Sequence, residues 1–315
     1  MQSQLSLVAD IGGTNTRVAL ARAGGVLHDS VRRFSNAEAD GLASVLAAYL
    51  GDMKPGPLAG ACVAVAGPVR DGMGQLTNLD WRIDRAELGA VTGAARLAVL
   101  NDLQAQGHAL GHLDEADLIR LTPQPPASAQ AARLVVGLGT GFNAAPIYDT
   151  AGGRFVPPSE CGHITLPCTS PALAALSRTL ARNHGFGAVE EALSGRGIVA
   201  VHAHLHGVTL TSIEIMDRLQ AGDTAATETA RLFIEALGTV LGDLALIHLP
   251  FGGIFLVGGM ARAITPWLTP LGFADAFRAK GRFAEFMDQF SIAVVTDDYA
   301  ALMGCAAHLD HLRAA

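Results

Sequence analysis

Short apolar runs alternate with amphipathic segments along the chain, and both halves open with the same pattern. An apolar run at Leu5–Ala9 is followed by a Gly-rich turn and a second run starting at Thr16, which predicts a β-hairpin. Runs at 134–137 and 143–148 flank a similar turn near the middle of the chain. This weak internal repeat predicts two α/β units that each begin with a hairpin.

The remaining apolar runs predict how each unit continues. The expected elements are a helix at Ala37–Leu50, buried strands at Ala61–Ala66 and Arg96–Leu100, a helix from Gln104, helices between 172 and 247, a strand at Gly253–Val257 and a helix at Ala300–Leu312. We place a small unit at 1–110, to which the C-terminal segment 298–315 returns, and a larger unit at 111–297. A cleft between two such units would be the usual place for a ligand.

Composition narrows the class of protein. The 315 residues are 50% hydrophobic and 16% charged, with a net charge of -7 and lysines only at positions 54 and 280. No basic face is clustered in the sequence, so we expect no nucleic-acid partner. The most apolar stretch, Leu241–Met260, is interrupted by an acid, a histidine and a proline, so we expect no membrane span. The N-terminus lacks the pattern of a signal peptide, which favours a cytoplasmic protein.

The first Gly-rich turn lies in the run Asp10–Arg17. Its glycines let backbone N–H groups approach phosphate oxygens, and the acid at the strand end could hold a hydrated magnesium ion. The alternative is an ordinary hairpin turn. No Gly-Lys-Ser/Thr follows a Gly-rich loop, so this is not a P-loop. The expected nucleotide-binding residues here are Asp10, Gly12, Gly13, Thr14 and Asn15.

Two further glycine motifs lie in the second half. Gly139, Thr140 and Gly141 repeat the first turn and could grip phosphates from a second hairpin. Gly258 and Gly259 end a buried strand, and a flat base could pack directly on such a backbone. A second hairpin turn and a tight strand-to-helix turn are the alternatives.

Asn101 and Asp102 follow the expected strand Arg96–Leu100. A carboxylate at the carboxyl end of a strand is well placed to accept a proton from a hydroxyl group, so Asp102 is our candidate general base. The alternative is that Asp102 caps the helix that follows it. Both roles could coexist.

Glu160, His163 and Glu190 are polar residues flanked by glycine or loop segments. Such side chains hold sugars through charge-assisted hydrogen bonds to neighbouring hydroxyls. The alternatives are a solvated loop acid, a structural histidine and an acid in the first turn of a helix. Cys161, His163 and Cys168 are irregularly spaced for zinc, so we expect no metal site there. His202 and His206, within a histidine-rich helix, are expected on a solvated face.

In order and over nearly the whole chain, these segments resemble the bacterial glucokinase family of the hexokinase–actin–Hsp70 superfamily. The resemblance implies a two-lobed actin-like ATPase (ribonuclease H-like) fold with a cleft between a smaller N-terminal and a larger C-terminal domain. It also implies ATP and Mg²⁺, glucose phosphorylated on its 6-hydroxyl, and a homodimer. The implied sugar-binding residues are Asn78, Asn101, Asp102, Glu160, His163 and Glu190, where Asn78 comes from a segment resembling the family's Thr-Asn-x-x-Trp.

The sequence departs from the family pattern at two positions. Cys161 stands where the second glycine of Glu-Gly-Gly-His is usual, and Asn143 stands where Gly-Thr-Gly-x-Gly ends in glycine. The Cys-rich zinc motif of the related ROK kinases is absent from the sequence, which favours the zinc-free branch. A kinase for another hexose or amino sugar, and a non-catalytic sugar sensor on the same scaffold, remain alternatives.

Overall fold

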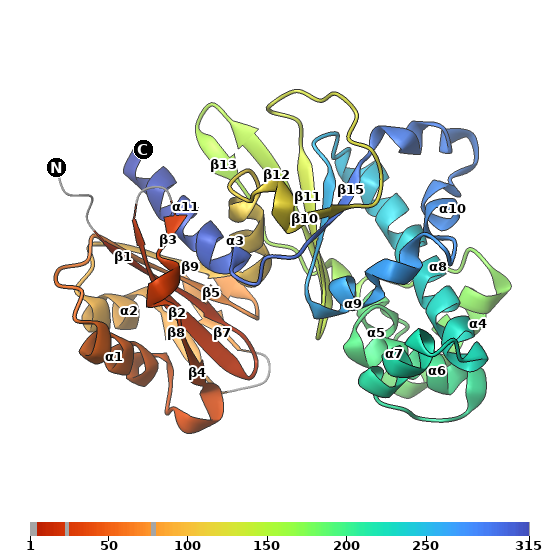
Figure 1. The fold of residues 1–315 in the computed structure, drawn as a ribbon, viewed down its shortest axis with the longest axis horizontal. Coiled ribbons are helices and arrows are strands. Elements are labelled where there is room, and N and C mark those ends of the chain that lie inside the picture. The colour runs from red at the N-terminus through yellow and green to blue at the C-terminus, as the bar shows by residue number, and fades with distance from the viewer. Residues whose placement is uncertain (1–4, 23–24, 77–79, 315) are drawn as a thin grey trace. The chain divides into compact units, whose positions relative to one another are not determined.

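The computed structural model describes residues 5–22, 25–76 and 80–314. The chain forms two compact units. The first comprises Met1–Asp114, Thr150–Pro158 and Asp297–Ala315, and the second comprises Glu115–Asp149 and Ser159–Thr296. Figure 1 shows the elements of each unit by their labels. Both units are built from a mixed β-sheet with helices, so the expected α/β class is confirmed.

A six-stranded sheet forms the centre of the first unit. Its strands are β1 (Ser6–Ile11), β2 (Asn15–Arg22), β3 (Gly25–Val26), β4 (Arg32–Ser35), β5 (Gly60–Val65) and β9 (Arg96–Asn101). The order is β3-β2-β1-β5-β9, with β4 also paired to β2. β1 and β2 are antiparallel, which confirms the first expected hairpin, whereas β5 and β9 run parallel to β1.

Both faces of this sheet are buried, which explains why β1 is a nearly continuous apolar run. Leu7, Ala9 and Ile11 contribute to one core cluster with α1 (Leu42–Met53), and Val8 contributes to another with α11 (Ala300–Ala314). Figure 1 shows α11 and α3 lying beside this sheet. The helices of this unit are α1 (Leu42–Met53), α2 (Arg85–Thr92), α3 (Asp102–Ala109) and α11 (Ala300–Ala314). A small three-stranded sheet adds β6 (Val69–Arg70), β7 (Met73–Gln75) and β8 (Arg82–Asp84).

The helix expected at Ala37–Leu50 was placed too early. Asn36–Glu38 form a 3₁₀ turn, and α1 begins only at Leu42, after Gly41 in an extended conformation. The reason is tertiary. The Asn36 side chain is held by hydrogen bonds to the first Gly-rich turn, so the segment from 36 to 41 follows that turn rather than its own helical pattern.

The second unit contains a sheet with the strand order β10-β15-β14-β11-β12-β13. The strands are β10 (Leu118–Arg120), β11 (Arg133–Leu138), β12 (Phe142–Thr150), β13 (Gly153–Phe155), β14 (Ile254–Val257) and β15 (Ile292–Val295). The antiparallel pair β11–β12 confirms the second expected hairpin. β14 pairs in parallel with β11, so this strand from late in the chain lies next to the hairpin in the sheet.

Helices make up most of the rest of this unit. They are α4 (Pro171–His184), α5 (Val189–Ala192), α6 (Gly195–His206), α7 (Ser212–Gln220), α8 (Thr224–His248), α9 (Gly259–Leu268) and α10 (Phe273–Arg278). The 25-residue helix α8 is the centre of the core, with buried side chains around its circumference from Ala226 to Ala245. Its high apolar content therefore reflects burial in protein. Among the described residues, we find no helix with the length and apolar character needed to cross a membrane.

Candidate active site

The first Gly-rich turn forms the floor of a hollow in the first unit. The Gly12 N–H donates to the carbonyl oxygen of Asn15 at 3.0 Å, which closes the turn between β1 and β2. The hollow has a volume of about 230 Å³. Its lining residues are Asp10, Gly12, Gly13, Thr14, Asn15, Arg17 and Arg33. All five residues expected to bind nucleotide from this turn therefore lie around one space, together with two arginines.

A buried asparagine from outside the motif holds this turn in place. Asn36 donates its side-chain N–H to the Gly12 carbonyl at 2.8 Å and accepts the Thr16 hydroxyl at 2.8 Å. The backbone N–H of Asn36 also donates to the carbonyl of Thr14 at 2.9 Å. The sequence around Asn36 gives no sign of this role, because nothing in its local pattern links it to a turn that lies more than twenty positions earlier.

Asp10 carries the negative charge of the hollow. Its carboxylate lies 3.6 Å from the Arg17 guanidinium. Burial raises the pKa of the Asp10 carboxyl above its ordinary value, and Arg17 offsets this only in part. A further cation beside Asp10 would stabilise the charged carboxylate against the cost of its burial. The site thus suits Mg²⁺, which is usually held in proteins by one or two carboxylates, phosphate oxygens and waters.

The candidate base, Asp102, lies at the same edge of this sheet as the turn. Ile11 of β1 pairs with Val65 of β5, which in turn pairs with Asn101 of β9. Because these strands are parallel, their carboxyl ends meet at one edge of the sheet, where α/β proteins bind ligands. Asp102 therefore emerges two strands away from the turn, about 10 Å at the usual strand spacing.

The N-cap of α3 is Asn101, so the alternative considered for Asp102, that it caps this helix, is filled by the residue before it. The Asn101 side chain accepts the Leu103 N–H at 3.0 Å, and Gln104 accepts the Asn101 N–H at 3.0 Å, which completes a capping box. Asn101 also donates to the Gly67 carbonyl at 3.0 Å. Asp102, half-buried, is the first residue of the helix, and its Oδ1 accepts the Leu103 N–H at 2.9 Å.

The second Gly-rich turn borders a pocket in the second unit. The Gly139 carbonyl accepts the N–H of Gly195 at 2.8 Å, which ties the turn to the start of α6. Gly258, at the end of β14, has a φ of 110°, and a Cβ there would lie 2.6 Å from the Leu138 carbonyl oxygen. Only glycine allows the strand end to pass so close to the hairpin. The result is that the first residues of α6 and α9 both lie beside the turn.

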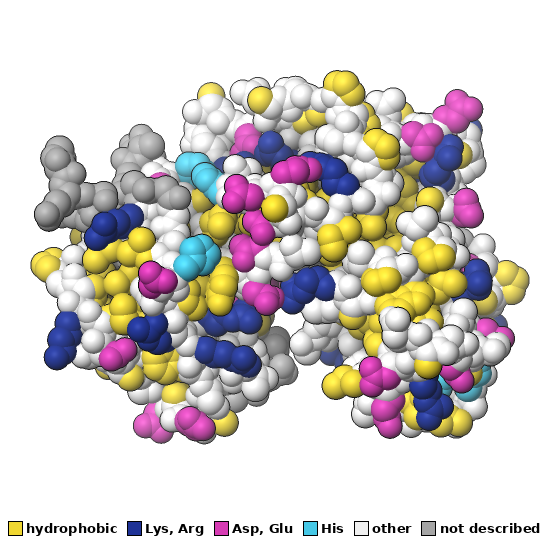
Figure 2. Space-filling view, viewed as in Figure 1, with side chains coloured by type: hydrophobic (Ala, Val, Ile, Leu, Met, Phe, Trp, Pro, Cys, Tyr) yellow, Lys and Arg dark blue, Asp and Glu magenta, His cyan; other side chains and the backbone are white. Residues whose placement is uncertain are grey.

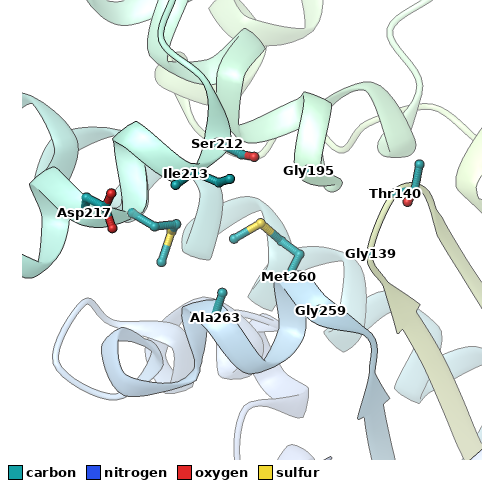
Figure 3. A pocket seen from close by; sticks show the side chains of 10 residues that line it. Gly139, Thr140, Gly195, Ser212, Ile213, Asp217, Gly259, Met260 and Ala263 are labelled. Carbon is teal, nitrogen blue, oxygen red and sulfur yellow. The ribbon is translucent and has the colours of Figure 1, made fainter. Parts of the chain in front are cut away.

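This pocket has a volume of about 430 Å³ and is mostly apolar (Figure 3). Its lining residues are Gly139, Thr140, Gly195, Ser212, Ile213, Met216, Asp217, Gly259, Met260 and Ala263. Figure 3 shows the Ile213 and Met260 side chains pointing into the space between α7 and α9. Methionine adapts its shape to flat ligands, so an aromatic base would fit here. The α7 residues were missed because their spacing is that of any amphipathic helix.

The three expected sugar-binding residues of this unit are electrostatically coupled. Burial raises the pKa of the Glu160 carboxyl, and the charge of Glu190 raises it further, whereas His163 lowers it. The backbone N–H of His163 donates to the backbone carbonyl of Glu160 at 3.1 Å within a short 3₁₀ turn. Glu160, His163 and Glu190 therefore form one polar group, as a polyhydroxylated ligand would require.

Glu190 also locks the second turn to this polar group. Its Oε2 accepts the Phe142 N–H at 3.0 Å, and its carboxylate forms an ion pair with Arg196. A Cβ on Gly141 would lie 2.4 Å from that Oε2, and one on Gly162 would lie 1.9 Å from the Phe142 carbonyl oxygen. Both glycines are therefore needed for close packing. Arg196 was missed because an arginine early in a helix carries no distinctive pattern.

The two departures from the family pattern contact each other. The Asn143 Oδ1 accepts the Cys161 N–H at 3.1 Å, and the Asn143 amide donates to the Ser159 carbonyl. Asn143 thus faces the loop that carries Glu160 rather than the glycine turn. It supplies a fixed attachment for a loop in which Cys161 replaces a glycine.

No group of three or more His, Cys, Asp or Glu residues in the described part of the chain is arranged to hold a metal ion. The solvated face expected for His202 was wrong. Its ring is buried and lies 2.8 Å from the Thr229 hydroxyl, because α6 packs this face against α8. His206 lies beside it with Nε2 3.0 Å from the Ala225 carbonyl. Asn78 falls outside the described residues, and its sugar contact stays a prediction.

Comparison with known proteins identifies the family. The family profile described as Glucokinase matches residues 7–312. The glucokinase of Nitrobacter hamburgensis is 32% identical over 312 residues, covering 96% of each chain. The crystal structure of glucokinase from an Antarctic psychrotroph is 31% identical, with a TM-score of 0.86 over 98% of this chain and 99% of that one.

A more distant structure has the same fold. The ROK family glucokinase from Streptomyces griseus, solved in complex with glucose and AMPPNP, is 20% identical, with a TM-score of 0.62 over 97% of this chain and 98% of that one. These likenesses confirm the expected fold of two-domain actin-like kinases. The chain belongs to the glucokinase family.

Proposed function

We propose that this protein transfers the γ-phosphate of ATP to the 6-hydroxyl of glucose, giving glucose 6-phosphate and ADP. The observation that carries the proposal is that Asp102 and the Gly12–Asn15 turn emerge at one edge of a single sheet. A carboxylate that accepts a proton and a nest of N–H groups that holds phosphates are the two parts that phosphoryl transfer to an alcohol needs. Membership of the glucokinase family supports the choice of glucose.

The reaction is an in-line displacement at phosphorus. The oxygen of the 6-hydroxyl attacks the γ-phosphorus while the bond from that phosphorus to the β–γ bridging oxygen breaks, so that ADP leaves with the electron pair. Asp102 takes the proton from the attacking hydroxyl. Asp102 is the first residue of α3, and its Oδ1 accepts the Leu103 N–H, which orients the carboxylate.

The two turns divide the nucleotide between them. We propose that the charged hollow at Gly12–Asn15 and the turn at Gly139–Gly141 bind phosphates, and that the base packs against Gly258 and Gly259. Support comes from the apolar pocket beside Gly259 and from the starts of α6 and α9, because helix N-termini favour anions. The similarly folded Streptomyces griseus glucokinase was solved in complex with AMPPNP.

Sugar binding draws on both units. Asn101 and Asp102 would contribute from the first unit, and Glu160, His163 and Glu190 from the second. The domain boundaries and the cleft expected from the sequence are part of this proposal. Asn101 and Glu190 already make structural hydrogen bonds, so each would use its remaining lone pairs or N–H for the sugar.

Mg²⁺ fits the same scheme. Asp10 would hold it, as a carboxylate with a pKa raised by burial in the hollow that Gly12, Gly13 and Thr14 also line. When bound, the ion neutralises charge on the phosphate oxygens.

Replacement of Asp102 by asparagine tests the general base. Asn keeps an oxygen that can accept the Leu103 N–H, so the helix start survives while proton transfer is lost. We expect kcat to fall by about 10²–10⁴-fold with little change in either KM. Asp84→Asn is the matched control, because Asp84 also accepts an N–H at a helix start, from Glu87 at 2.8 Å. Near-normal turnover of the Asp102 variant would refute the assignment.

A panel of sugars tests the substrate. ADP release should be fastest with glucose among glucose, mannose, fructose and glucosamine. Preference for another member would make the protein a kinase for that sugar, and binding of glucose without ADP release would make it a sensor. We also propose, on family resemblance, that the protein is cytoplasmic and forms a homodimer, and light scattering on purified protein measures the mass that decides its oligomeric state.

A further inference from the structure

Three charged side chains form one row across the sheet of the first unit. Asp10 of β1 pairs with Arg17 of β2, and Arg17 pairs with Arg33 of β4. Directly opposed residues on antiparallel strands point to the same face. All three accordingly line the hollow that contains the Gly12–Asn15 turn. Figure 2 shows Lys and Arg side chains gathered over the region of β2 and β4.

The row carries one more cation than anion. Arg17 is engaged, since it lies 3.6 Å from Asp10 and also donates to the Asp298 carbonyl at 3.2 Å. The Arg33 guanidinium makes no hydrogen bond or ion pair within the described part of the chain. Like charges directly opposite one another on neighbouring strands are destabilising. Arg33 is exposed and stands directly opposite Arg17 at the rim of a hollow of about 230 Å³, so a negatively charged ligand bound there would offset the repulsion between the two arginines.

The neighbouring arginine shows what an ordinary surface arginine looks like on this strand. Arg32 pairs with Val18, and successive residues of a strand point to opposite faces. Its guanidinium donates to the carbonyls of Asp29 and Val31, both at 3.0 Å, and lies 3.8 Å from the Asp52 carboxylate. The Arg32 guanidinium is thus held by groups of its own neighbourhood, whereas the Arg33 guanidinium has no such partner within the described part of the chain.

We propose that Arg33 binds the phosphates of the nucleotide and sets the affinity for the phosphoryl donor. This inference rests on the proposed function, because it takes the hollow as the place of the triphosphate. A guanidinium suits this task because its planar N–H groups match the oxygens of a phosphate. The glycine motif does not predict Arg33, which lies on β4, a strand that pairs with β2 of the hairpin.

Kinetics of Arg33→Ala, Arg33→Gln and Arg32→Ala test the proposal. A charge-assisted hydrogen bond to phosphate is worth enough to raise the KM for ATP by about tenfold when Arg33 is replaced. The KM for glucose should stay unchanged in both Arg33 variants. The rise should shrink at about 0.5 M salt, because exposed charges are screened. Arg32→Ala should leave all constants unchanged.

Thermal unfolding of the ligand-free protein separates binding from structure. If Arg33 serves the ligand, removing its repulsion with Arg17 should leave the unfolding temperature equal or slightly higher. A lower unfolding temperature together with an unchanged KM for ATP would assign Arg33 a structural role and overturn the proposal.

Binding of tripolyphosphate, measured by calorimetry without glucose, makes the test independent of turnover. We expect about tenfold weaker binding to Arg33→Ala than to the parent and to Arg32→Ala. Equal binding to all three proteins would refute the role of Arg33 and leave the proposed kinase activity intact. Weaker binding to Arg33→Ala in a protein that releases no ADP with any sugar would instead uphold the phosphate site and refute the kinase activity.

Discussion

The two glycine turns resemble each other in sequence but differ in what surrounds them. Both join antiparallel strands, β1 and β2 in the first unit and β11 and β12 in the second. The first is bordered by three charged side chains, Asp10, Arg17 and Arg33, from strands of its own sheet. The pocket beside the second is lined mainly by apolar side chains, including Ile213, Met216 and Met260, from helices α7 and α9.

This difference teaches that a Gly-rich turn specifies backbone freedom and little more. In our proposal, the part of the ligand that each turn serves depends on the third element that packs beside it. In the first unit that element is β4, which adds the cation of Arg33 to the lining of the hollow. In the second unit it is α7, which adds the apolar side chains of Ile213 and Met216 to the lining of the pocket. The turns also differ in what lies beside them, because Asn143, two residues after Gly141, bonds to the backbone of the loop at Ser159 and Cys161.

Replacing Gly258 should have the largest effect on stability. A Cβ there would lie 2.6 Å from the Leu138 carbonyl oxygen, and the φ of 110° is strained for any other residue. We expect Gly258→Ala to lower the free energy of unfolding by about 2–5 kcal/mol, measured by denaturant unfolding.

Two alanine variants serve as controls for Gly258. At Gly259 a Cβ would meet nothing within 4 Å, and at Gly12 it would lie at an ordinary 3.4 Å from the Asn15 carbonyl. Both should be stable, whatever their activity. Equal stability of all three variants would show that the close approach at the second turn is dispensable.

Asn143→Ala should have an intermediate effect, on the sugar and not on the nucleotide. The variant loses the hydrogen bonds from Asn143 to the loop at Ser159 and Cys161. With each bond worth about 1 kcal/mol, we expect the KM for glucose to rise about tenfold, measured by steady-state kinetics. Asn143→Asp keeps the acceptor for the Cys161 N–H, so its KM for glucose should lie between those of the parent and of Asn143→Ala. A change in the KM for ATP alone would mean that Asn143 serves the turn instead.

The smallest effect is expected from Asp10→Asn in the absence of ligands. Burial raises the folded pKa of Asp10, so above its unfolded value of 3.8 the folded protein binds more protons than the unfolded chain. Stability therefore falls as pH rises from 3.8 to the folded pKa, and the cost persists above it. The variant lacks this cost, so its unfolding temperature at neutral pH should be slightly higher than that of the parent.

The pH dependence of stability tests whether the buried Asp10 carboxyl is the source of this cost. The parent should lose stability relative to Asp10→Asn as pH rises through that window, while turnover of the variant falls at every pH. Asp52→Asn, at an exposed acid, controls for the loss of a negative charge. A variant less stable than the parent at neutral pH would mean that the attraction to Arg17 outweighs burial.

Much of the fold followed from local pattern. Both hairpins and the buried strands β5, β9 and β14 were predicted, because apolar runs between turn residues are visible directly in the sequence. The start of α1 was wrong because Asn36 bonds to a turn from another part of the chain. The alternative that Asp102 caps α3 could not be separated from capping by Asn101 in the sequence, since Asn and Asp are equally good caps and only the geometry distinguishes them.

The sequence by itself determined where the glycines, the acids and the apolar strands lie, and with them the family and the position of Asp102. Those features are local, because backbone freedom and strand periodicity depend on neighbouring residues. Only the tertiary structure decided that Arg33 shares a hollow with Asp10, that α7 lines the second pocket, that Glu190 bonds to Phe142 beside the second turn, and that Asn143 bonds to the loop at Cys161. These contacts join residues distant in the chain, and it is the packing of elements, not their local pattern, that brings them together.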